Sequence, residues 1–168
     1  MAIPTELLPH RALVIMSAMS DQPLVALNAH LLSGEASYRS AGIHGYLYNT
    51  LAQLPEVAPE FRYLAFVGQG RPPVHPGLSV RRSKLQTQKP LTRIVWEQVV
   101  APSELAHFKP DLLHGMAFAL PLRWRGPSVV PFSALGFTPH PERPSPAPRL
   151  YLRPFPRASA RRAHRVIA

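Results

Sequence analysis

One stretch, residues 24–54, limits the folds open to this 168-residue chain more than any other. Its first four residues, LVAL, form an apolar run typical of a parallel strand that is covered on both faces. A loop containing Gly34 and Gly42 follows. From Ile43 onward apolar residues recur at steps of three and four, which is the helical period. The stretch therefore predicts a buried strand, a glycine loop and an amphipathic helix.

Strands and helices are expected to alternate along the rest of the chain. Runs of aromatic and branched residues predict strands, and three- and four-residue spacing predicts helices. The expected strands are residues 61–67, 78–82, 111–115, 128–132 and 165–168, and the expected helices are residues 91–108 and 157–164. Pro55 is expected to stop the first helix at Leu54. This order predicts an α/β fold, namely a Rossmann-like open, mainly parallel sheet with helices on both faces.

The helix expected over residues 91–108 is predicted in two pieces, because Pro102 interrupts it. Ser103 or a residue before it is expected to cap the second piece. Five apolar side chains share the side expected to face inward: Ile94, Val95, Val99, Leu105 and Phe108. Trp96 is expected to pack in the interior, whereas Trp124, in a loop, can either pack or contact a sugar.

Charge is distributed unevenly along the chain. The net charge is +10, and residues 123–168 contain nine arginines against the single acid Glu142. Such a segment can attract phosphates of nucleic acid, anionic lipid or a nucleotide sugar. Four of these arginines recur at every fourth position: Arg149, Arg153, Arg157 and Arg161. They predict a basic stripe, which is either a solvated face or a peripheral contact with a membrane surface.

The N-terminal residues 1–23 show no sustained period and are expected to form a poorly ordered leader. They do not resemble a signal peptide, because Glu6 precedes every basic residue. No apolar run approaches the ~20 residues of a membrane span, and the absence of cysteine excludes disulfides and thiolate metal sites. We therefore expect a cytoplasmic protein with one domain over residues 24–168.

A series of short motifs runs through this domain in a fixed order. They are NAHLLSG (28–34), SAGIHGYLYN (40–49), KPDLLHG (109–115), LPLRW (120–124), PSVV (127–130), LGF (135–137) and SARRAHRVIA (159–168). In order and spacing this series resembles the N-terminal domain of family-4 retaining glycosyltransferases, which have the two-domain GT-B fold. In such enzymes a C-terminal donor-binding domain follows, and these 168 residues do not contain one.

The resemblance implies transfer of a sugar, with retention, from a nucleotide-sugar donor to a glycan or a lipid-linked acceptor. It implies no cofactor beyond the nucleotide sugar as co-substrate, and no metal. The residues implied to face the donor phosphate are Gly34, Ser40, Ala41, Gly42, Ile43 and His44, and those implied to line the acceptor cleft are His30, His114, Gly115 and Trp124. Spacing alone favours Gly42 as no more than a tight turn into the helix, and the resemblance makes the phosphate-facing role equally good. A lone histidine such as His114 can be structural.

The chain also departs from the family pattern. Ser133 and Ala134 occupy the positions where the family usually has a His-Asp pair, and Gly45 replaces a basic residue. The 168-residue chain by itself is therefore expected to be inactive. Two alternatives follow: a truncated remnant without donor chemistry, and a basic nucleic-acid-binding protein. The second lacks any recognisable nucleic-acid motif, so no specific nucleic-acid partner is expected.

Overall fold

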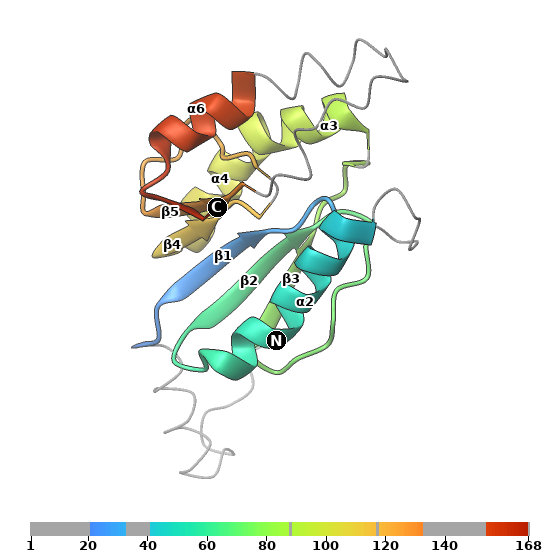
Figure 1. Cartoon of the computed structure of the whole chain (residues 1–168), viewed down its shortest axis with the longest axis vertical. Coiled ribbons are helices and arrows are strands. Elements are labelled where there is room, and N and C mark those ends of the chain that lie inside the picture. The colour runs from blue at the N-terminus through green and yellow to red at the C-terminus, as the bar shows by residue number, and fades with distance from the viewer. Residues whose placement is uncertain (1–20, 33–40, 88, 117, 133–153, 168) are drawn as a thin grey trace, which may run out of the picture.

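The computed structural model describes residues 21–32, 41–87, 89–116, 118–132 and 154–167 (Figure 1). The strands of these residues are β1 (Leu24–Asn28), β2 (Arg62–Val67), β3 (Leu78–Arg82), β4 (Leu112–His114), β5 (Ser128–Pro131) and β6 (Arg165–Ile167). The helices are α2 (Ala41–Val57), α3 (Pro90–Val95), the π-helical turn η2 (Trp96–Val100), α4 (Ala101–Phe108) and α6 (Pro154–Arg162).

The six strands form one sheet in the order β3-β2-β1-β4-β5-β6. All five neighbouring pairs are parallel, so the predicted Rossmann-like open sheet is confirmed. The chain runs outward from β1 to β3 on one side and then from β4 to β6 on the other. The direction of winding thus reverses between β1 and β4. Ligands of open parallel sheets bind at the carboxyl ends of the strands beside such a reversal.

Each face of the sheet carries its own core, because successive side chains of a strand point to opposite faces. On one face Leu27 of β1 packs with Leu47 and Leu51 of α2. On the other face Ala26 and Phe66 pack with residues of η2 and α4. Helices therefore cover both faces, as predicted, with α2 on one side and α3, η2 and α4 on the other (Figure 1).

Helix α2 is longer than predicted. It continues through Pro55 to Val57, whereas the proline was expected to stop it at Leu54. The Pro55 ring is buried, and the amide of Ala58 still donates to the Leu54 carbonyl at 3.0 Å. In the last turn of a helix a proline removes one hydrogen bond only, and burial of the ring offsets that loss.

The segment from α3 to α4 also differs from the prediction. It is divided at Val95 and Val100 rather than at Pro102, and η2 fills the interval. Pro102 has no N–H to bond the carbonyl four residues back, so the chain widens its turn just before the proline. Ser103 does not cap α4 through a backbone amide; its hydroxyl donates instead to the Val100 carbonyl at 2.7 Å.

The wide turn also changes which side chains of this segment face the sheet. Val95 and Val99 were predicted to face inward, but they are 51% and 67% exposed. Trp96 and Glu97 are buried in their place. A regular helical period therefore fails here, because each residue of a π-helix advances by a smaller angle and two consecutive side chains can both point inward.

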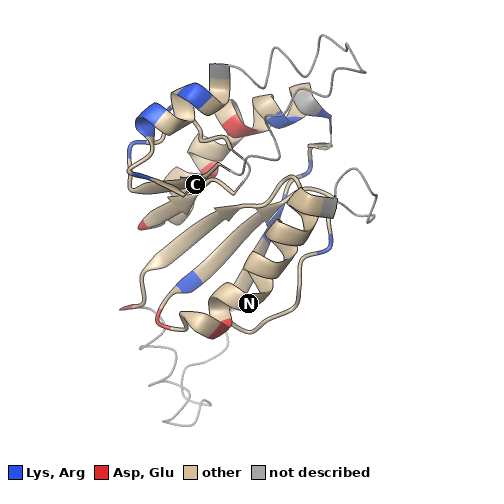
Figure 2. Ribbon diagram, in the orientation of Figure 1, with Lys and Arg blue, Asp and Glu red and all other residues tan. Residues whose placement is uncertain are grey.

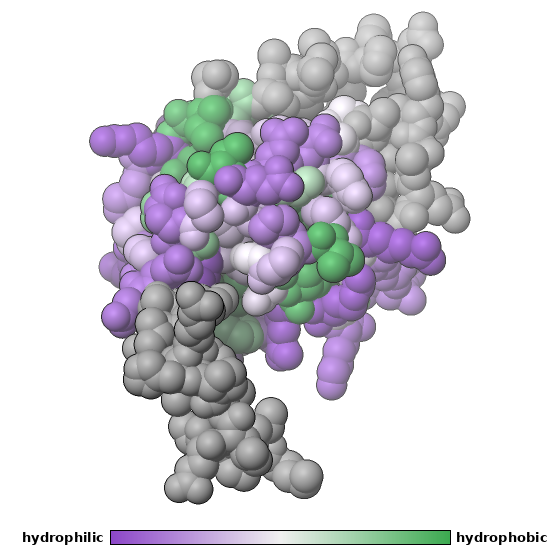
Figure 3. Space-filling model, turned by 90° about the horizontal axis from the view of Figure 1, so that it is seen from below, coloured by the Kyte–Doolittle hydropathy of each residue, from purple (hydrophilic) through white to green (hydrophobic). Residues whose placement is uncertain are grey.

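Seen from below, the described surface is mostly hydrophilic, and its hydrophobic side chains gather in separate small patches (Figure 3). Among the described helices, none combines the length and the hydropathy needed to cross a membrane.

Candidate functional site

The carboxyl ends of β1 and β4 hold the residues that the fold marks as a candidate site. His114 is the last residue of β4, and it lies directly beside Leu27 of β1 in the sheet. Helix α2 brings Tyr46 to the same place, where its hydroxyl lies 3.5 Å from Nε2 of His114. Two residues that are 68 positions apart in the sequence therefore meet at the reversal of the strand order.

Both members of this pair are uncharged near neutral pH. Burial lowers the pKa of His114 from 6.5 to about 4. Burial raises the pKa of Tyr46 above 10.0, and the hydrogen bond to Thr50 opposes this. The phenol can donate and the neutral imidazole can accept, although 3.5 Å is near the upper limit of a hydrogen bond. A neutral donor beside a neutral acceptor suits a ligand hydroxyl.

Open space lies along the first turns of α2 next to Tyr46. A Cβ atom at Gly42 or at Gly45 would meet no atom of the described residues within 4 Å, and neither glycine has a positive φ. Gly45 and Tyr46 lie three and four residues after Gly42, so both neighbour Gly42 along one side of the helix. A glycine inside a helix costs ~0.5–1 kcal/mol relative to alanine. Neither packing nor backbone conformation requires these two glycines, which leave the helix backbone open to a ligand.

We expect Gly42→Ala and Gly45→Ala each to raise the free energy of unfolding by ~0.5–1 kcal/mol, because alanine fits the space and favours the helix. Chemical denaturation of the full chain measures this change. A loss of stability in either variant would show that the space beside α2 is filled by another part of the protein.

His30 lies on the opposite face of the sheet from the Tyr46–His114 pair. It is 2% exposed, and its ring centroid lies 3.7 Å from that of Trp96. Its Nδ1 bonds the hydroxyl of Thr87 at 2.9 Å. Burial, and to a lesser degree the charge of Arg93, lower the pKa of His30 to about 3. This histidine is therefore a neutral interior group rather than part of a shared acceptor cleft.

Further polar side chains are buried around His30 on this face. Asn28, at the end of β1, is 3% exposed, and Glu97 of η2 is 1% exposed. The sequence interpretation overlooked Asn28, Thr87 and Glu97. Two of them could have been found: Asn28 is an amide that ends an otherwise apolar strand, and Glu97 is a carboxylate inside an apolar helix. The sequence around Thr87 gave no such signal.

Of the other predicted site residues, some lie outside the described part of the chain and some lie on α2. Gly34, Ser40, Ser133 and Ala134 lie outside the described residues, as do Arg149 and Arg153 of the expected basic stripe. Ala41 is the first residue of α2, and Ile43 packs against the core beneath that helix. His44 lies 6.1 Å, between ring centroids, from Tyr48.

Gly115 and Trp124 are both accounted for by packing. A Cβ atom at Gly115 would lie 2.8 Å from the Ala119 carbonyl oxygen, so close packing requires glycine there. Trp124 packs against the core on the η2 side, and its indole nitrogen donates to the Pro127 carbonyl at 3.2 Å. Trp96 is 4% exposed and packs in the interior, as predicted.

Lys and Arg outnumber Asp and Glu among the described residues, and several of these basic positions lie along α6 (Figure 2). Arg157 and Arg161, two members of the expected stripe, are both exposed on this helix. Across the part of the chain that the structure describes, no three His, Asp or Glu side chains gather in a set that could hold a metal ion.

The sheet order and the carboxyl-edge residues define an α/β protein of the Rossmann-like class. No protein-family model matches the chain, and no curated protein or solved structure matches it either. Inferences about its function therefore depend on its own residues and their geometry.

Proposed function

We propose that this chain is the acceptor-side domain of a retaining glycosyltransferase of the GT-B class. The proposed reaction transfers a sugar from a nucleotide-sugar donor to a glycan or a lipid-linked acceptor. The observation that carries the proposal is the meeting of Tyr46 and His114 beside the glycine side of α2, at the reversal of the strand order. The order of the sequence motifs supports the same class of enzyme.

In the proposed transfer the bond between the anomeric carbon and the donor phosphate breaks, and a bond from the acceptor oxygen to that carbon forms. The phosphate leaves with the bonding electron pair, and the acceptor hydroxyl passes its proton to an oxygen of the departing phosphate. Tyr46 and His114 are assigned to hold the acceptor hydroxyl, since both are neutral hydrogen-bonding groups. The open side of α2 at Gly42 and Gly45 is assigned to the donor diphosphate.

The proposed partners are a C-terminal donor-binding domain, a nucleotide sugar and its acceptor. The proposed location is the cytoplasm, with a peripheral contact at the inner face of the membrane. Arg157 and Arg161 of α6 are exposed and can contribute ~1 kcal/mol each near anionic lipid.

An inactive remnant is the second candidate. The observation that favours it is Ser133 followed by Ala134, since neither side chain supplies the imidazole or the carboxylate of the family's His-Asp pair. A remnant would keep the sheet and the glycine side of α2 without binding donor or acceptor.

Ligand-observed NMR with the full 168-residue chain tests the proposal, using uridine diphosphate, guanosine diphosphate and a series of methyl glycosides as probes. We expect wild-type protein to bind at least one methyl glycoside. Tyr46→Phe should weaken that binding by about 3- to 10-fold, because it removes one hydrogen bond of ~0.5–1.5 kcal/mol.

Tyr48 provides a matched control, since it lies on the same helix and is 40% exposed against 41% for Tyr46. Tyr48→Phe should leave glycoside binding unchanged. Equal effects of the two substitutions would reject Tyr46 as a ligand contact. If wild-type protein binds neither a nucleoside diphosphate nor a glycoside at ~10 mM, the remnant replaces the enzyme domain as the explanation.

A further inference from the structure

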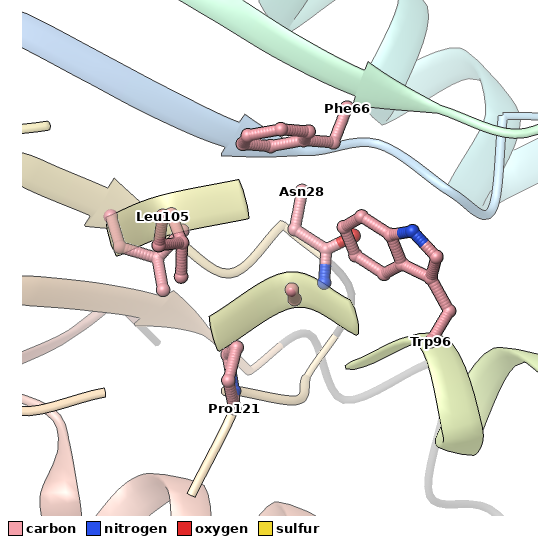
Figure 4. A pocket seen from close by; sticks show the side chains of 7 residues that line it. Asn28, Phe66, Trp96, Leu105 and Pro121 are labelled. Carbon is pink, nitrogen blue, oxygen red and sulfur yellow. The ribbon is translucent and has the colours of Figure 1, made fainter. Parts of the chain in front are cut away.

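A small pocket lies beneath η2, on the face of the sheet opposite to Tyr46 and His114. Its walls come from β1, β2, β4, η2, α4 and the loop after β4, and we call it the η2 pocket. It is lined by Asn28, Phe66, Trp96, Ala101, Leu105, Leu113 and Pro121. Six of these seven side chains are apolar or aromatic, and the amide of Asn28 extends toward the Trp96 ring (Figure 4).

Two buried polar atoms beside Trp96 have no hydrogen-bond partner within the described protein. They are Oδ1 of Asn28, in the pocket wall, and Nε2 of His30, whose ring packs on Trp96. Asn28 and His30 are 3% and 2% exposed. A buried polar group without a partner costs ~1–3 kcal/mol, so proteins seldom keep one without a use for it.

We propose that the η2 pocket is a binding position for a hydroxyl group, supplied either by a water molecule or by a neutral polyol such as a sugar. Its space of about 10 Å³ is at the lower limit of what one water molecule or one hydroxyl needs. A hydroxyl hydrogen can be donated to Oδ1 of Asn28. This proposal does not depend on the proposed function.

The chemistry of the pocket selects a neutral group rather than an ion. The His30 ring is neutral above about pH 3, and the Asn28 amide has no charge. None of the described side chains that line the pocket is charged, so its walls offer no direct partner for an anion or a cation. The apolar walls would make an ion costly to bury.

Nitrogen-labelled wild-type protein provides the first measurement. The chain contains two asparagines, Asn28 and the exposed Asn49, so their side-chain amide signals are simple to assign and the second is an internal reference. If water holds the position, the Asn28 amide should show a cross-peak to a long-lived water, and glycerol or methyl glucoside should not shift it. If a polyol holds it, the Asn28 signal should shift and saturate with either probe. The Asn49 signal should stay unchanged in both cases.

Asn28→Leu, with Asn49→Leu as its matched control, separates a bound hydroxyl from an unused cavity. Because Asn28→Leu removes the Asn28 amide itself, the ring signals of Trp96, which also lines the pocket, serve as the reporter in this comparison. We expect Asn28→Leu to abolish the water cross-peak or the saturable shift at Trp96, and Asn49→Leu to leave either one intact. Inorganic phosphate should cause no shift at the Asn28 amide. A wild-type protein with neither a long-lived water nor a polyol response at Asn28 would overturn the proposal, and this result needs no variant.

Discussion

Acidification from about pH 6.5 to about pH 4 should remove on the order of 5 kcal/mol from the free energy of unfolding, because the buried His30 and the partly buried His114 are both held as neutral rings. In the unfolded chain both imidazoles bind protons near pH 6.5. In the folded chain His114 binds one only near pH 4, and His30 only near pH 3. The unfolded state therefore holds more protons between these limits, and the free energy of unfolding falls by up to ~1.4 kcal/mol per pH unit for each ring.

The sign of this effect is fixed by the direction of the two pKa values. Both lie below the value of a free histidine, so the stability from the neutral rings is complete above pH 6.5 and is lost as the pH falls. Urea denaturation at a series of pH values measures the slope. Imidazole NMR signals assign it to individual rings, since carboxylates titrate in the same range.

Substitution separates the contributions of the two rings. His30→Phe keeps an aromatic contact with Trp96 and should roughly halve the slope between pH 6.5 and pH 4 and remove the histidine slope between pH 4 and pH 3. His114→Gln should roughly halve the slope above about pH 4 and leave the lower part unchanged. Val130→Ala is the control: it removes buried methyl groups without changing a titratable group, so it should lower stability equally at every pH. A wild-type profile that is flat from pH 6.5 to pH 4 would show that neither ring is held neutral by burial.

The strands of this fold could be predicted from the sequence because their signals are local. LVAL in β1 and RYLAFV in β2 are continuous apolar runs, as expected for strands buried on both faces. Because strands and helices alternate along the chain, the rules for how successive elements connect favour a parallel open sheet. The expected placement of His114 at the carboxyl end of a strand followed from the same local pattern and from Gly115 after it.

The η2 turn could not be predicted in the same way. Pro102 indicated a break, but a straight helical period placed the break at the proline and pointed Val95 and Val99 inward. The actual widening begins before the proline at Trp96, where the large ring packs between His30 and Phe66. These contacts join residues that are distant in sequence, and no local pattern reports them.

For the site residues too, the local sequence predicted the secondary structure but not the contacts with distant residues. Tyr46 belongs to the helical period that predicts α2, but that period gave no sign that its hydroxyl lies 3.5 Å from His114. The family resemblance implied that His30 lines an acceptor cleft, yet Thr87, 57 residues away, and Trp96 enclose it. A loop residue is buried when a later segment packs over it, and the sequence near that residue does not contain the information.

Gly70 lies in the segment after β2, which packs against the loop after β1. We expect Gly70→Ala to lower the free energy of unfolding by about 3 kcal/mol. A Cβ atom at Gly70 would lie 2.3 Å from the carbonyl oxygen and 2.7 Å from the carbonyl carbon of Leu32. Leu32 is 1% exposed, and its amide donates to the Ala29 carbonyl at 3.0 Å. The clash is therefore with a held backbone rather than with a flexible side chain, and the chain must move to relieve it.

Gly45→Ala is the matched control for Gly70→Ala, since both replace a glycine of negative φ by the same residue and only one meets a neighbour. Urea denaturation should place the two variants on opposite sides of wild type. Gly70→Ala should also shift the amide NMR signals of residues 29–32, because the close approach after β2 fixes the loop after β1. If both variants are equally stable and these signals do not move, the segment after β2 does not rest on that loop, and the burial of His30 beside it must have another cause.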